Sequence, residues 1–152
     1  MKLAIVIEGE QNSGKTSTIK ELINLFTDRK LVQMKRGWQT IFLNHTFKSL
    51  RLICYCIPAS PSETGVEIGK RLKGFTPEVL IVAEQPSGQH YSDTYNYLNM
   101  NGYTIVAFSI HNKKGSLVWE RFDSKSKALK LKNRANEIVD EMRHFLKTNS
   151  II

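Results

Sequence analysis

Residues 3–26 narrow the choice of fold more than any other part of the sequence. Residues 3–7 form a continuous apolar run, which is typical of a β-strand covered on both faces. A short polar stretch containing Gly9 and Gly14 follows this run. Residues 16–26 then carry apolar side chains at spacings of three and four, the period of a helix that buries one face. The sequence therefore predicts a strand, a glycine-containing loop and a helix, in that order.

The loop between this strand and this helix carries a phosphate-binding pattern. The run Gly9-Glu10-Gln11-Asn12-Ser13-Gly14-Lys15-Thr16 matches the motif GxxxxGK[ST] at all four specified positions. With average residue usage, such a match arises by chance in roughly one chain of this length in two hundred. The required strand and helix on either side make chance less plausible still. On this motif, known as Walker A, the chain resembles the P-loop NTPase superfamily.

The residue types suit the binding of a polyphosphate. Several N–H donors must point at one place, and a loop can supply them only where glycines such as Gly9 and Gly14 permit unusual backbone dihedrals. The start of the following helix adds N–H groups without intrahelical partners and the positive end of the helix dipole. We therefore expect phosphate to lie over residues 14–17. A plain glycine turn is the alternative, but turn chemistry does not require Lys15-Thr16 after Gly14.

The resemblance implies a role for each residue of the motif. Lys15 is expected to reach the β- and γ-phosphates, Thr16 to coordinate Mg²⁺ through its hydroxyl group, and Ser17 to contact the α-phosphate. The side chains between Gly9 and Gly14 are expected to matter less than the backbone amides around them. The predicted nucleotide-binding residues are Gly9, Asn12, Ser13, Gly14, Lys15, Thr16 and Ser17.

A second acidic position completes the site that the resemblance implies. Members of the superfamily carry an acid at the end of another buried strand, where it holds Mg²⁺, and here Glu84 follows the apolar residues 79–83. We predict Glu84 as a magnesium ligand and, with Lys15, as a catalytic residue. The family more often has aspartate there, and an ordinary strand-terminal glutamate is the alternative. If Glu84 faces the magnesium, its strand should neighbour the first strand, as in kinase- and GTPase-like members.

Strand and helix patterns continue along the whole chain. Further strands are predicted at residues 31–35, 50–57, 79–83 and 103–110, and further helices at 60–73, 92–100 and 128–146, whereas 36–49 resists assignment. The sequence thus predicts an α/β fold with three layers, in which a mostly parallel sheet has helices on both faces. The resemblance implies the P-loop NTPase fold. No linker divides the chain, so residues 1–152 are expected to form a single nucleotide-binding domain.

Composition limits the surroundings in which the chain works. No stretch approaches the roughly 20 apolar residues of a membrane helix, and the first apolar run meets Glu8 too early for an export signal. We expect a cytoplasmic protein without membrane contact. Only Cys54 and Cys56 are present, and they lie one residue apart on a predicted strand. They are interpreted as free thiols in the core rather than as metal ligands.

The positive charge gathers toward the carboxyl-terminal third. Of the net charge of +8, residues 111–134 supply +6, from eight Lys/Arg residues against Glu120 and Asp123. Three interpretations stay open: a solvated helix face, a phosphate-sensing lid, or a surface for nucleic acid or an acidic partner. The lid would use Arg121, Lys125, Lys127 and Arg134.

The segment after Glu84 is a further candidate. Residues 85–97 lie where switch or substrate loops often follow the acidic strand. Tyr91 and Tyr95 share one helix face, which is typical of packing residues, and His90 has no partner in the sequence pattern that would mark it as a base.

Three functions are consistent with these features. The first is Mg²⁺-dependent transfer or hydrolysis of a γ-phosphoryl group by a small kinase or NTPase, the second a nucleotide-dependent switch with slow hydrolysis, and the third nucleic-acid binding through residues 111–134. ATP is favoured over GTP, because Asn112-Lys113 resembles a guanine-reading motif whose aspartate is replaced by Gly115. The sequence identifies neither a second substrate nor a protein partner.

Overall fold

A computed structural model describes residues 2–10, 13–27, 36–42, 51–61, 66–111, 118–120 and 127–149. Within these residues, six strands form one sheet in the order β2-β3-β4-β1-β5-β6. The strands are β1 (Leu3–Glu8), β2 (Gly37–Phe42), β3 (Arg51–Ile57), β4 (Val79–Glu84), β5 (Thr104–His111) and β6 (Val118–Glu120). The helices are α1 (Lys15–Phe26), α3 (Ile68–Leu72), α4 (Tyr91–Met100) and α5 (Lys127–Thr148).

The sheet is mostly parallel. The central strand β1 pairs in parallel with β4 on one side and with β5 on the other, and the pairs β3–β4 and β5–β6 are also parallel. Among the described strands, only β2 runs antiparallel, along the outer side of β3. The prediction of an α/β fold with a mostly parallel sheet is confirmed, as is the expected adjacency of the first strand and residues 79–83.

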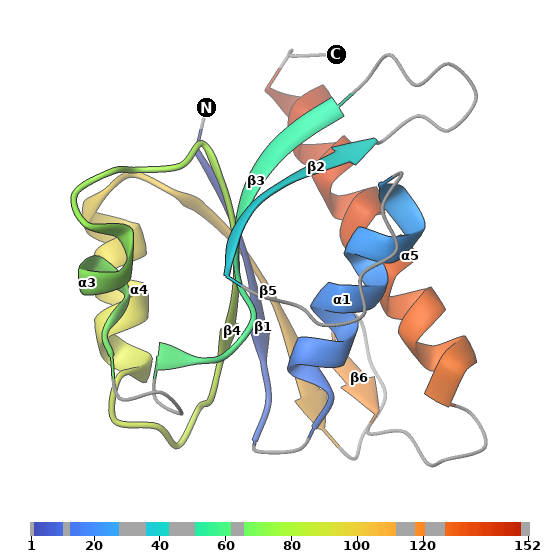
Figure 1. Cartoon of the computed structure of the whole chain (residues 1–152), viewed down its shortest axis with the longest axis horizontal. Coiled ribbons are helices and arrows are strands. Elements are labelled where there is room, and N and C mark those ends of the chain that lie inside the picture. The colour runs from blue at the N-terminus through green and yellow to red at the C-terminus, as the bar shows by residue number, and fades with distance from the viewer. Residues whose placement is uncertain are drawn as a thin grey trace.

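Helices cover both faces of this sheet (Figure 1). α1 and α5 lie on one side, whereas α3 and α4 lie on the other. Alternate residues of β1 point to opposite faces: Leu3, Ile5 and Ile7 belong to the apolar cluster that includes α1 and α5, and Ala4 and Val6 belong to the cluster under α3 and α4. A strand buried on both faces needs this continuous apolar run.

Most predicted elements agree with the structure to within one or two residues at their ends. The strands at 3–7, 50–57, 79–83 and 103–110 and the helices at 16–26, 92–100 and 128–146 are confirmed. The strand predicted at 31–35 lies outside the described residues. β2 occupies part of the segment that the sequence left unassigned.

The helix predicted over residues 60–73 is wrong as one continuous element. Glu67 has extended backbone dihedrals, with φ −65° and ψ 156°, and α3 begins only after it. The capping pattern at Ser60 predicts where a helix can start, not how far it continues. Residues 64–66 are threonine, glycine and valine, which all have low intrinsic helix propensity.

The fold places the carboxyl ends of several strands at one edge of the sheet. Because β1, β3 and β4 are parallel, the residues that follow these strands meet there. In Figure 1, β1 ends at the lower edge of the sheet, and α1 begins beside it. Such edges are where open α/β sheets bind ligands. Among the described residues, none of the helices combines the length and the apolar character needed to cross a membrane.

Candidate functional site

The turn from β1 to α1 depends on its two glycines. Gly14 has a φ of 95° and a ψ of 21°, in the left-handed region that side chains rarely adopt. A Cβ atom on Gly9 would lie 2.2 Å from Ser13 Oγ and 3.3 Å from Ile110 Cβ. Gly9 therefore lies too close to Ser13 and Ile110 to accept a side chain without a shift, and Gly14 needs the freedom of glycine for its dihedrals.

Ser13 contributes a buried polar atom to this turn. The residue is 2% exposed, and its Oγ has no hydrogen-bond partner within the described part of the chain. Buried hydroxyl groups are usually hydrogen-bonded, because leaving one unsatisfied costs about 1–3 kcal/mol. An oxygen-rich ligand in the turn would supply such a partner, so this atom fits the predicted phosphate site.

Lys15 lies over the turn rather than pointing into solvent. The side chain is only 5% exposed, and its Nζ donates to the carbonyl oxygens of Gly9 at 2.8 Å and Glu10 at 3.0 Å. Lysine is almost never buried unless its charge is paired. The ammonium group is therefore held where the loop could present it to a phosphate.

The start of α1 presents further groups to the same place. Thr16 is exposed, and its hydroxyl donates to the carbonyl oxygen of Pro58 at 2.7 Å. That bond uses the only proton of the hydroxyl and leaves lone pairs on the oxygen. Ser17 is half-buried beside it, and no side chain of the described residues caps the start of the helix. Asn12, also predicted in this site, lies outside the described residues.

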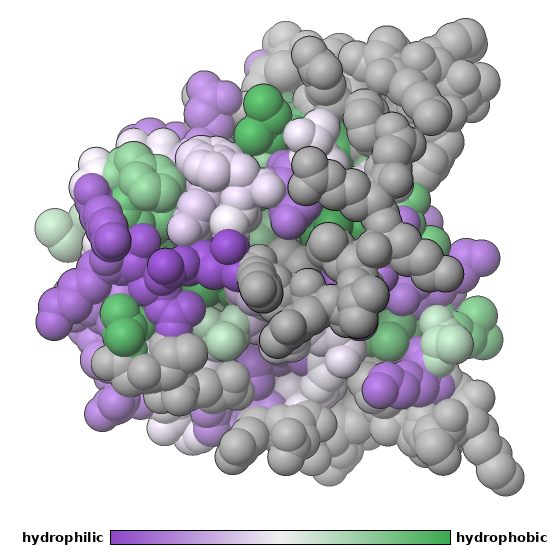
Figure 2. Space-filling model, in the orientation of Figure 1, coloured by the Kyte–Doolittle hydropathy of each residue, from purple (hydrophilic) through white to green (hydrophobic). Residues whose placement is uncertain are grey.

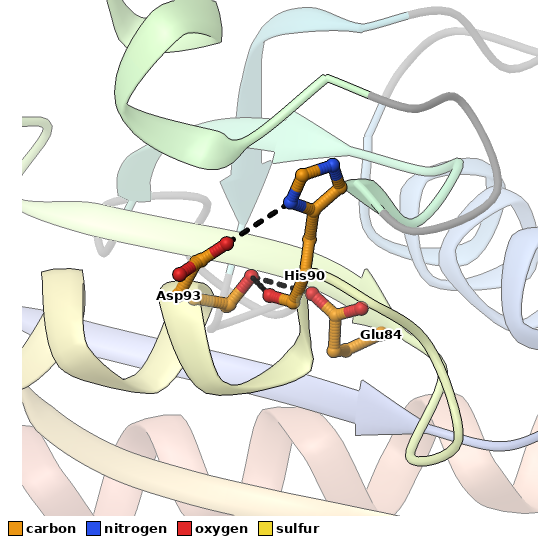
Figure 3. A network of polar contacts seen from close by, with 4 residues as sticks. Glu84, His90 and Asp93 are labelled. Carbon is orange, nitrogen blue, oxygen red and sulfur yellow. Dashed lines mark hydrogen bonds and ion pairs between the residues drawn. The ribbon is translucent and has the colours of Figure 1, made fainter.

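Glu84 lies next to the turn, with its side chain directed toward α4 (Figure 3). Its backbone oxygen accepts from Gly9 N at 3.0 Å. The carboxylate is fully buried and accepts from the backbone N–H of Gln85 at 3.0 Å and from the hydroxyl of Thr94 at 2.5 Å. The structure thus brings the predicted acid to the same edge as the motif and holds it with donors from the chain that follows its strand.

A second buried acid, Glu8, stands beside it and was not predicted. The two glutamates are partners in the register of β1 and β4, and Glu8 is 8% exposed. It accepts from the hydroxyls of Tyr91 at 2.6 Å, Ser109 at 3.2 Å and Tyr95. Glu8 directly follows the apolar residues 3–7, just as Glu84 follows the apolar residues 79–83. The sequence alone could therefore have indicated Glu8 as a second acid at this edge.

Tyr91 and Tyr95 pack against each other as their spacing predicted. Their ring centroids are 5.0 Å apart. Burial, followed by the hydrogen bond to Glu8, raises the pKa of Tyr91 to about 12, and the same causes raise the pKa of Tyr95 still further above its ordinary value. Both phenols therefore keep their protons and act as donors that attach α4 to the end of β1.

The segment after β4 also contacts the glycine turn itself. Glu10 accepts from Ser87 Oγ at 2.6 Å and from Gln85 Nε2 at 3.2 Å. The hydrogen bond from Ser87 is the largest cause of a pKa for Glu10 that lies below its ordinary value. Residues 85–87 are thus joined to the turn between β1 and α1.

His90 has a partner that the sequence did not reveal. Its Nδ1 lies 3.0 Å from Asp93 Oδ2, one turn further along the chain (Figure 3). The interpretation that His90 lacks a partner that would mark it as a base is therefore wrong.

The predicted basic block does not form one solvated face. Lys127 and Lys132 on α5 are exposed, but Arg134 is 2% exposed and donates to Thr18 Oγ1 on α1 at 3.2 Å. Burial lowers the pKa of Arg134 to about 10. Arg121 and Lys125 lie outside the described residues. Arg134 thus connects two helices and does not belong to an exposed lid.

The two cysteines lie in the core, as predicted. Both thiols are free and fully buried, and burial raises the pKa of Cys56 to about 12 and that of Cys54 well above its ordinary value. Buried thiols with raised pKa values are poor nucleophiles, which is typical of structural cysteines.

Comparison with known proteins gives no match. No family model matches the chain, and neither does any curated protein sequence. A function for the chain therefore has to be inferred from its residues and their geometry.

Proposed function

We propose that the chain is a P-loop NTPase that binds a nucleoside triphosphate with Mg²⁺ at residues 9–17 and transfers or hydrolyses its γ-phosphoryl group. ATP is the preferred nucleotide. The observation that carries the proposal is the position of Lys15, whose ammonium group is folded over the turn between Gly9 and Gly14. A phosphate oxygen could replace these carbonyl oxygens as an acceptor for the ammonium group.

The groups around Lys15 favour a ligand with several phosphate oxygens over an anion with a single charge. The Ser13 hydroxyl has no partner among the residues that the structure describes, and within the same residues the first turn of α1 has neither an acidic residue nor a side-chain cap. The first N–H groups of a helix lack intrahelical acceptors, and together with the helix dipole they favour an anion at that point. Backbone donors, a lysine and a hydroxyl are thus gathered at one end of one helix.

The residues that would hold Mg²⁺ are Thr16 and Glu84. The hydroxyl oxygen of Thr16 keeps lone pairs after donating to Pro58, and oxygen ligands are those that Mg²⁺ prefers. Glu84 provides a carboxylate at the same edge of the sheet, beside Glu8. When bound, the ion would neutralise charge on the phosphates, while Lys15 would stabilise the charge that develops on the transferred group.

The proposal is tested by comparing Lys15→Ala with Lys20→Ala, which removes the same kind of side chain from the same helix five residues later. Phosphate release from ATP and product formation with a panel of small acceptors would be measured with and without Mg²⁺. We expect magnesium-dependent turnover that Lys15→Ala lowers by about 100-fold or more and that Lys20→Ala keeps. Equal rates in wild type and Lys15→Ala would refute the proposal.

A nucleotide-dependent switch is the second candidate, and the contacts of Glu10 favour it. Ser87 and Gln85 donate to this residue inside the turn, and Tyr91 and Tyr95 donate to Glu8 directly before the turn. A γ-phosphate that moves the turn would therefore also disturb residues 85–97. The output of such a switch would be a changed surface for a partner.

Hydrogen exchange separates this candidate from a simple enzyme. Amide protection would be measured with ADP and with a non-hydrolysable ATP analogue, both with Mg²⁺. A switch predicts a difference at residues 85–97, while α5 on the opposite side of the sheet serves as the internal control. The same protection of residues 85–97 in both nucleotide states would exclude the switch.

A further inference from the structure

Three side chains that can ligate a metal gather on the face that carries α3 and α4. His90 and Asp93 belong to the start of α4, and Glu67 immediately precedes α3. One ligand atom from each of the three lies within 4.8 Å of the others. Figure 3 shows the imidazole of His90 and the carboxylate of Asp93 turned toward each other. The region over α3 is strongly hydrophilic in the view of Figure 2.

The charges in this cluster call for a cation. Glu67 and Asp93 bring two carboxylates close together, and like charges at this distance repel. Asp93 is paired with His90, whereas the side chain of Glu67 makes no hydrogen bond within the described part of the chain, and it does not cap α3. A divalent cation among the three groups would remove the repulsion and give the Glu67 carboxylate a partner.

The position of the cluster leaves room for exchange with solvent. A surface cavity of about 210 Å³ between α3 and α4 is lined by Glu67 and Asp93, together with Asn96 and Tyr97. Asp93 is about half exposed and His90 is one-fifth exposed. Two of the three proposed ligands thus line a solvent-accessible cavity, and a site with three protein ligands leaves a coordination position for water, which is typical of an open metal site rather than a closed structural one.

The donor set indicates which metal the cluster would take. Mg²⁺ prefers oxygen ligands and keeps much of its water, whereas an imidazole nitrogen with carboxylate oxygens suits Zn²⁺ and related transition metals. Zn²⁺ binds histidine nitrogen and carboxylate oxygen at about 2.0–2.2 Å. Because His90 Nδ1 and Asp93 Oδ2 are already 3.0 Å apart, only the Glu67 carboxylate has to move appreciably to close the site.

We propose that Glu67, His90 and Asp93 bind one zinc-type divalent cation, at a site separate from the glycine turn. Such an ion would fix the start of α4 against the start of α3. Thr94, the next residue after Asp93, donates to Glu84, so a single hydrogen bond from α4 connects this part of the helix to the buried acid of the proposed nucleotide site. The cation site does not depend on nucleotide binding.

The experiment measures Zn²⁺ uptake by the whole chain, without nucleotide and without Mg²⁺, through competition with a chromophoric zinc indicator. His90→Ala and Glu67→Gln are compared with wild type, and His144→Ala removes an exposed imidazole from α5 as the matched control. Glu67→Gln keeps the size of the side chain and breaks no hydrogen bond that the structure describes. Circular dichroism checks that each variant is folded.

We expect wild type and His144→Ala to take up one equivalent of Zn²⁺ with the same affinity. His90→Ala and Glu67→Gln should each weaken binding at least tenfold, and excess Mg²⁺ should not displace the ion. The proposal is overturned if wild type binds no stoichiometric Zn²⁺, or if either of the two site variants keeps the wild-type curve. Because nucleotide is absent, these outcomes leave the proposed nucleotide function untouched.

Discussion

Individual residues of the glycine turn explain why the motif has its particular spacing. Gly9 lies where a Cβ atom would meet Ser13, and Gly14 has a positive φ that glycine adopts without strain. The ammonium group of Lys15, the residue after Gly14, donates to the carbonyl oxygen of Gly9. The spacing of the two glycines and the lysine is therefore a property of the backbone path.

Gly9→Ala should lower the free energy of unfolding by roughly 1–3 kcal/mol, the usual cost of overpacking. Rotation of the Ser13 hydroxyl would relieve only the shortest contact, because Ser13 Cβ at 3.1 Å and Ile110 Cβ at 3.3 Å would remain too close. Denaturant unfolding measures the change. Gly69→Ala is the control, since its new Cβ would meet nothing closer than 3.8 Å and alanine is preferred within a helix. Equal loss of stability in both variants would contradict this account.

Sequence reasoning located the residues that are adjacent along the chain but missed pairs that the fold creates. Lys15 and Thr16 could be assigned because the motif is continuous. Glu8 and Glu84 become neighbours only through strand pairing across 76 positions. The pairing of His90 with Asp93 has an ordinary helical spacing, but its significance depends on Glu67, which a separate element brings near.

At the scale of elements, α4 is attached to the sheet by polar contacts at its first two turns. Tyr91 and Tyr95 donate to Glu8 at the end of β1, and Thr94 donates to Glu84 at the end of β4. The helix thereby satisfies two buried carboxylates on neighbouring strands. Its orientation is set by these acids as well as by the apolar contact of Leu98.

Thr94→Val keeps the shape of the side chain but removes the donor to a fully buried carboxylate. We expect it to lower the free energy of unfolding by roughly 1–3 kcal/mol, the cost of a lost partner for a buried acceptor. Thr94→Ser keeps the hydroxyl and should cost less, since it loses only a methyl group. The two variants would be compared by urea unfolding. A Thr94→Val protein as stable as wild type would show that Glu84 does not need this donor.

Elements were predictable where the local pattern and the fold agree. The strands β1, β4 and β5 are apolar runs, and α5 has a regular apolar stripe, so pattern and burial lead to the same assignment. The helix predicted over residues 60–73 failed because a start signal says nothing about length. The edge strand β2 gave no clear pattern, since Trp38 on it is about half exposed and its pairing with β3 alone defines it.

At the scale of the molecule, the order of the strands determines where chemistry can occur. With β1 between β4 and β5, the glycine turn and both buried glutamates lie at one edge of the sheet. α1 and α5 cover one face of the sheet, and α3 and α4 cover the other (Figure 1). α4 connects the two proposed sites, because it carries Asp93 of the cation site and Thr94, which donates to Glu84 of the nucleotide site. Nucleotide binding by the turn is the claim from which the proposed function follows.

The most direct measurement of that claim is a titration of the ¹⁵N-labelled protein with Mg-ATP, followed by the amide signals of each residue. We predict saturable shifts that are largest at residues 13–17, because phosphate oxygens would become hydrogen-bond acceptors for the N–H groups of this segment. Lys15→Ala should abolish these shifts, whereas Lys20→Ala should keep them. Spectra that do not change, or saturable shifts confined to residues away from the turn, would contradict the account.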